Sequence, residues 1–288
     1  MPFDPPATPD APRKFQHRYW VHVLWFLATL VSTTLFCGLF FGLVVFDYSL
    51  PVLAILAAHE FGHYFACRRY DVDATLPYFI PAPIILTGTF GAVIRIRQGF
   101  PSKAALFDIA VAGPIAGFLA LLPFLFYSFR FQTIAAIDPA RPPDVIFGEP
   151  LLFKLASLWW FGPLPAGADE IISPMGFAAW VGMLATALNL LPFGQLDGGH
   201  VSYAVFGKRS WIVSALTLAT TIAMTFISIS WLATALIMVI MAMFLGLGHP
   251  QVPDSEAPLD PARKAIAVLV VIIFALCVTP VPIVLFGG

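Results

Sequence analysis

Seven long apolar segments dominate the sequence, and most are long enough for a helix to cross about 30 Å of hydrocarbon. Charged residues make up only 11% of the chain, whereas a soluble domain carries about 25%. We therefore predict an all-α polytopic membrane protein in contact with the lipid bilayer. The segments cover residues 19–46, 50–69, 103–131, 171–191, 211–227, 231–247 and 265–286.

The number of membrane crossings depends on the fifth and sixth segments. Only Ser228–Ser230 separates them, so they form either two spans or one re-entrant hairpin, and the expected count is six or seven. Asp47–Ser49 is predicted to be a polar turn between the first two spans. Residues 1–18 are rich in Pro, Asp and Ala, which predicts a disordered tail. Residues 19–288 are then one membrane-embedded domain with a core at about 50–208.

Basic residues predict the orientation of the chain. If the N-terminus is cytoplasmic and all seven segments span, only Arg130, Arg141 and Lys154 lie outside, and the other twelve of the fifteen Lys and Arg residues lie inside. This asymmetry fits the positive-inside rule. Residues 132–170 are then the extracytoplasmic loop. The short tails suggest a bacterial cytoplasmic membrane, and the absence of a basic patch argues against nucleic acid as a partner.

The second apolar segment carries the sequence His59-Glu60-Phe-Gly-His63. Residues four apart lie on the same face of a helix, so the two imidazoles can bind one Zn²⁺. Glu60 lies about 100° around the helix from His59 and can act as a general base towards water. An ionisable side chain inside a bilayer is costly, which makes this cluster a functional candidate.

Asp197 is the best candidate for a third zinc ligand. It follows the fourth apolar segment, where Pro192, Gly194, Gly198 and Gly199 disfavour continuous helix. Irregular backbone at membrane depth is tolerated where it is buried or lines a water-filled cavity. The predicted orientation brings Asp197 and the His-Glu-x-x-His sequence to the same depth, near the cytoplasmic side.

A small interfacial β element is predicted at residues 76–99, between the second and third spans. From Thr89 onward apolar and polar residues alternate, with Phe90, Ala92 and Ile94 on the apolar face. An edge strand of this kind can capture an extended peptide by β-augmentation. We expect these three residues to bind substrate; a purely structural hairpin is the alternative.

These residues resemble the site-2 proteases, zinc metalloproteases that cut within membranes. The family pattern of His-Glu-x-x-His in one helix and Asn-x-x-Pro-x-x-x-Leu-Asp-Gly in another is complete at residues 59–63 and 189–198, and residues 112–117 are similar to a third family stretch. The likeness covers about residues 50–208 and is closest to the branch without a PDZ domain, which includes bacterial and chloroplast homologues.

The resemblance implies an intramembrane zinc endopeptidase for regulated proteolysis of transmembrane proteins. It implies that His59, His63 and Asp197 bind zinc, that Glu60 activates water and protonates the leaving amine, and that Asn189 stabilises the oxyanion or positions the substrate. A structural cap is the alternative for Asn189. Gly113 and Gly117 are assigned to helix packing.

Two functions of other classes remain open. An ion transporter would use the same polar residues, although such proteins often carry inverted repeats and none is evident here. A catalytically inactive scaffold would bind membrane proteins without cutting them, and the intact Glu60 argues against it. The sequence carries no indication of oligomeric state. His200 is predicted to have a structural role. Asp108, one turn past Lys103 and near the membrane surface, is expected to form a local ion pair or to have an interfacial role.

Overall fold

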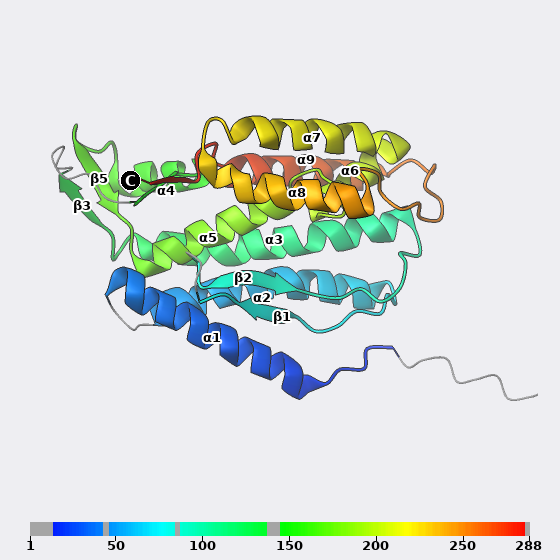
Figure 1. The fold of residues 1–288 in the computed structure, drawn as a ribbon, viewed down its shortest axis with the longest axis horizontal. Helices are drawn as coiled ribbons and strands as arrows, with labels where there is room; N and C mark the ends of the chain where they lie inside the picture. The colour runs from blue at the N-terminus through cyan, green and yellow to red at the C-terminus, as the bar shows by residue number, and fades with distance from the viewer. Residues whose placement is uncertain (1–13, 43–45, 84–86, 137–144, 286–288) are drawn as a thin grey trace, which may run out of the picture.

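The computed structural model describes residues 14–42, 46–83, 87–136 and 145–285. The described chain is mainly helical, with most helices running side by side along the longest axis (Figure 1). The α-helices are α1 (Tyr19–Phe41), α2 (Phe46–Arg69), α3 (Lys103–Ser128), α4 (Leu151–Phe161), α5 (Pro174–Asn189), α6 (Asp197–Phe206), α7 (Ser210–Met224), α8 (Leu232–Leu245) and α9 (Pro261–Cys277).

Among the described residues, α1, α2 and α3 are long and apolar enough to cross a membrane. The remaining apolar segments form helices of 14 to 17 residues, and the fourth segment is divided between α5 and α6. The break before Asp197 was predicted from Pro192 and the glycines that follow it.

Within the residues that the structure describes, three two-stranded antiparallel sheets accompany the helices, although only one β element was expected. The predicted one pairs β1 (Tyr78–Pro81) with β2 (Thr89–Val93) and lies beside α1 and α2 (Figure 1). The other two pair β3 (Thr133–Ala136) with β5 (Ala168–Ile171), and β4 (Val145–Phe147) with β6 (Ile283–Leu285). The loop predicted at residues 132–170 therefore contains strands as well as helix α4.

Two predicted boundaries are wrong. Asp47–Ser49 is not a turn but the first turn of α2, where the charge of Asp47 suits the positive end of the helix dipole. Tyr48 is buried there, and its hydroxyl donates to the carbonyl of Thr87 at 2.5 Å. The last apolar segment is helical only to Cys277. Pro280 and Pro282 interrupt it before β6, because proline cannot continue a helix.

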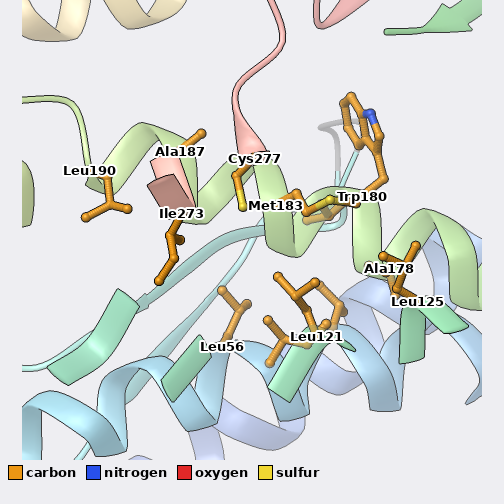
Figure 2. Packing of buried hydrophobic residues seen from close by; sticks show 14 of the residues in the cluster. Leu56, Leu121, Leu125, Ala178, Trp180, Met183, Ala187, Leu190, Ile273 and Cys277 are labelled. Atoms are coloured by element: carbon orange, nitrogen blue, oxygen red, sulfur yellow. The ribbon is translucent and has the colours of Figure 1, made fainter. Parts of the chain in front are cut away.

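The main core lies where α2, α3 and α5 pack together, and Leu56, Leu121 and Met183 meet there (Figure 2). Gly182 of α5 permits this close approach, because a Cβ at that position would lie 2.9 Å from the side chain of Ile55. Trp180 closes one end of the core, and its Nε1 donates to the carbonyl of Gly148 at 2.7 Å. This rigid core fixes the position of the α2 face that carries the two histidines.

An ionic cluster joins α3, α9 and the residue that follows α2 at the other end of the bundle. Arg263 donates to both carboxylate oxygens of Asp108, at 2.8 and 2.6 Å, and to the hydroxyl of Tyr70 at 3.3 Å. The expected partner of Asp108, Lys103, instead donates its ammonium group to the carbonyl of Ser255 at 3.0 Å. The sequence could not identify Arg263 as the partner, since it lies 155 residues further along the chain.

Glu170 of β5 should make the stability of the protein depend on pH. Burial, followed by the nearby carboxylates of Glu149 and Asp169, raises the pKa of Glu170 to about 7. Between its ordinary pKa and about 7, the folded chain retains a proton that the unfolded chain has lost. Stability should therefore fall as pH rises through this window and level off above it.

We expect Glu170→Gln to flatten this part of the stability profile and to raise the melting temperature at pH 8. Unfolding of the detergent-solubilised protein between pH 5 and 8 measures the effect. Glu256→Gln is the control, because that carboxylate is 86% exposed. Equal slopes in the wild type and Glu170→Gln would contradict the assignment.

Candidate metal centre

Three potential ligand atoms from α2 and α6 converge at one point. The Nε2 atoms of His59 and His63 lie 3.2 Å apart, and each lies 3.3 Å from Oδ2 of Asp197. Zinc–ligand bonds of about 2.0–2.1 Å in a tetrahedron place neighbouring ligand atoms about 3.3 Å apart. The three separations therefore fit one tetrahedral Zn²⁺ with a fourth position open.

The histidine tautomer supports a metal site. Nδ1 of His63 lies 2.7 Å from the carbonyl oxygen of Ile109, which can only accept a hydrogen bond. Neutral His63 must therefore carry its proton on Nδ1, leaving the Nε2 lone pair directed at His59 and Asp197. A hydrogen bond of this kind orients metal-binding imidazoles in many sites. His59 and His63 are 5% and 7% exposed, so water forms few hydrogen bonds with their ring nitrogens.

The break between α5 and α6 brings Asp197 to the histidines. Helix α5 ends at Asn189, and α6 begins at Asp197. Gly194 has a φ of +53°, which favours glycine. A Cβ on Gly198 would lie 2.1 Å from the carbonyl oxygen of Leu190, and a Cβ on Gly199 would lie 2.4 Å from that of Gly194. The glycines therefore let the chain fold tightly back before Asp197.

Gly113 and Gly117 of α3 pack directly on the two imidazoles. A Cβ on Gly113 would lie 2.1 Å from Nε2 of His63, and a Cβ on Gly117 would lie 3.1 Å from Cβ of His59. The sequence indicated that the pair allows close helix packing. Its relation to the histidines requires the register between α2 and α3, which the sequence pattern did not reveal.

Glu60 lies beside the candidate ligands in a cavity of about 250 Å³. Its side chain is buried, and Ile94 lines the same cavity. Asn189 lines the same cavity, with its Nδ2 atom 3.4 Å from Nε2 of His59. The structure thus brings together all five residues predicted for metal binding and catalysis.

The predicted substrate-binding residues have different surroundings. Ala92 and Ile94 line the cavity, whereas Phe90 is 69% exposed and is not among the lining residues. The register explains the difference: Ile80 pairs with Gly91 and Pro81 with Thr89, so Phe90 is an extra residue in a β-bulge. Gly91 has a φ of +99° at this bulge, and the expected alternation begins only after it.

His200 also lines the cavity, although a structural role was expected. Its Nδ1 lies 2.7 Å from Nε2 of His249, and Nδ1 of His249 lies 2.6 Å from the carbonyl oxygen of Pro250. His249 also stacks on Tyr203, with ring centroids 4.3 Å apart. His200 thus attaches the segment between α8 and α9 to the wall of the cavity. Two histidines 49 residues apart gave no signal of this contact in the sequence.

The chain is similar to plant proteins named as zinc metalloproteases. Over 231 residues it is 31% identical to "Probable zinc metalloprotease EGY2, chloroplastic" of Oryza sativa subsp. indica, covering 80% of this chain and 41% of the relative. Over 179 residues it is 36% identical to "Probable zinc metalloprotease EGY1, chloroplastic" of Arabidopsis thaliana, covering 59% of this chain and 32% of the relative. The chain thus spans less than half the length of these curated relatives.

The family model described as "Peptidase family M50" matches residues 48–233. The match includes nearly all of α2, the whole of α3, the break between α5 and α6, and every side chain of the candidate metal centre. It covers more than half of the chain. The chain belongs to peptidase family M50.

Proposed function

We propose that this protein is an intramembrane zinc endopeptidase that hydrolyses a peptide bond in or near a transmembrane segment of its substrate. The convergence of His59, His63 and Asp197 beside buried Glu60 is the observation that carries the proposal. Family membership and the names of the relatives support it. The proposed substrates are membrane proteins that are cut in regulated intramembrane proteolysis. The proposed catalytic domain of this protein comprises residues 19–288.

His59, His63 and Asp197 hold the metal in this proposal. Bound zinc supplies an acidified water and a polarised carbonyl group. Glu60 accepts a proton from the attacking water and then donates one to the leaving amine. Asn189 lies near enough for its amide to donate a hydrogen bond to the developing oxyanion or to the substrate backbone.

The proposed topology has six or seven spans, a cytoplasmic N-terminus and a catalytic site near the cytoplasmic side. The distribution of Lys and Arg supports it, with three residues outside and twelve inside. Helices shorter than 18 residues can contribute if the bilayer thins locally or if flanking residues extend to the interface. Labelling of single cysteines introduced at Arg95 and Lys154 tests this orientation. The cysteine at position 95 should be labelled from the cytoplasmic side of the membrane, and the cysteine at position 154 from the opposite side.

Strand β2 is the proposed binding edge for the unwound substrate. Within the described residues it pairs only with β1, and Ile94, which directly follows it, lines the same cavity as Glu60. A substrate strand added at this edge would run along the cavity that holds the candidate metal ligands. Backbone hydrogen bonds would then hold the scissile peptide in an extended form.

Ala92→Pro should reduce cleavage at least about tenfold while leaving the zinc content unchanged, because proline removes a backbone donor and disfavours strand pairing. Cleavage of a transmembrane substrate and zinc stoichiometry are measured on the same preparation. Ala92→Ser is the matched control, since it retains the N–H group and nearly the same volume. Equal cleavage by both variants would reject the proposed edge.

Metal removal tests the proposed reaction itself. Treatment with a chelator should abolish cleavage of a transmembrane substrate in detergent or liposomes, and stoichiometric Zn²⁺ should restore it. A metal-independent activity would exclude this mechanism. Zinc binding without any cleavage would favour an inactive scaffold. Ion flux in liposomes that required the same residues would favour a transporter.

A further inference from the structure

Two adjoining cavities lie at the end of the bundle where α6 ends and where α7 and α9 begin. The first, here called the cationic cavity, has a volume of about 680 Å³, and its charged lining residues are Lys103, Lys208, Arg209, Lys264 and one carboxylate, Glu256. The second, here called the apolar groove, has a volume of about 620 Å³ and runs between α6, α7 and α9. Val205, Phe206 and Lys264 line both.

The cationic cavity contains positive charge that the described chain does not neutralise. Lys103 is buried and donates to the carbonyl of Ser255, and Lys208 lies 3.4 Å from the carboxylate of Glu256. No described acidic side chain lies within ion-pairing distance of Arg209 or Lys264. These two cations are therefore available to an anionic ligand.

The apolar groove has the opposite chemistry. Apart from Lys264 at its end, its lining is almost entirely aliphatic or aromatic, with Val201, Val213 and Val271 on three different helices. Val268 and Val271 are 61% and 63% exposed, which is costly in water and favourable against hydrocarbon. A ligand that fits both spaces carries a negative group at one end and long apolar chains at the other.

We propose that this composite site binds an anionic phospholipid, with its phosphate between Arg209 and Lys264 and an acyl chain in the apolar groove. Basic pockets between membrane helices are suited to such head groups, and each cation near the surface contributes favourably. An ordinary boundary lipid would fill the groove without selecting a head group. The unpaired charge at the mouth of the groove is what favours an anionic lipid over a zwitterionic one.

The composite site is separate from the candidate metal centre, because the two are lined by different residues. Pro192 and Gly198 form part of the groove wall, so an acyl chain would pack against the segment that carries Asp197. Arg209 and Lys264 do not line the cavity that contains Glu60. Lipid binding can therefore be measured without reference to proteolysis.

Native mass spectrometry of the delipidated, detergent-solubilised protein tests the site with phosphatidylglycerol and phosphatidylcholine of identical acyl chains. We expect the wild type to bind phosphatidylglycerol more tightly. Arg209→Gln/Lys264→Gln should weaken that binding on the order of tenfold or more, and should leave phosphatidylcholine binding unchanged. Arg69→Gln/Arg95→Gln is the control, since it removes the same charge from residues that line neither cavity.

A second variant addresses the groove without changing charge. Val268→Trp should fill part of the groove and weaken phosphatidylglycerol binding, and a melting curve establishes that the variant is folded. Equal wild-type affinity for the two lipids, or an equal loss in the two double variants, would overturn the proposal. Displacement of the lipid by inorganic phosphate at the same concentration would overturn it too, because the ligand would then be a free anion.

Discussion

Glu60→Gln should keep the wild-type zinc content and lower the cleavage rate about 100- to 10,000-fold, the usual contribution of a positioned general acid–base. The substitution preserves shape and removes only the ability to accept and return a proton. Glu60 lies in the cavity beside the three converging atoms but contributes none of them. Single-turnover cleavage of a transmembrane substrate, with zinc measured on the same sample, separates catalysis from metal binding.

Glu60→Asp is the matched control, because it keeps the carboxylate but withdraws it by one methylene. We expect partial activity, since proton transfer depends on hydrogen-bond reach. Full activity in Glu60→Gln would falsify the proposed mechanism. Loss of zinc in Glu60→Gln would instead mean that the carboxylate is needed to assemble the metal site.

The convergence of the candidate ligands was largely predictable because it depends on local rules. The spacing of His59 and His63 places them on one helix face, and the glycines and Pro192 predict the break that delivers Asp197. Both patterns lie within short stretches of sequence. The apolar segments likewise indicated the positions of α1, α2 and α3, because membrane-spanning helices are specified by length and composition.

Features that depend on distant pairing were not predictable. Strands β4 and β6 join residues near 146 to residues near 284, and each has only three residues. The partner of Asp108 and the contact between His200 and His249 are also distant in sequence. The bulge at Phe90 changed the side-chain alternation, because one extra residue in a strand shifts the residues beyond it to the opposite face.

The packing of Gly113 against His63 should have a large effect on the geometry of the candidate metal site. Its Cα faces the imidazole of His63 so closely that a methyl group would lie 2.1 Å from Nε2, 2.4 Å from Cδ2 and 2.5 Å from Cε1. The ring cannot withdraw freely, because its Nδ1 is held by the carbonyl of Ile109, which is also on α3. A side chain at position 113 must therefore displace the ring or separate α2 from α3.

Gly113→Ala should accordingly weaken zinc binding at least about 100-fold, more than the usual effect of altering an outer-shell contact, and abolish cleavage with it. Zinc stoichiometry after dialysis against a graded chelator measures the loss.

Gly117→Ala should have a smaller effect, because its added Cβ meets Cβ and Nδ1 of His59 at 3.1 and 3.2 Å. Gly182→Ala is the packing control: its Cβ meets the side chain of Ile55, so stability should change while zinc is retained. Normal zinc affinity in folded Gly113→Ala would show that the imidazole of His63 is not confined by α3.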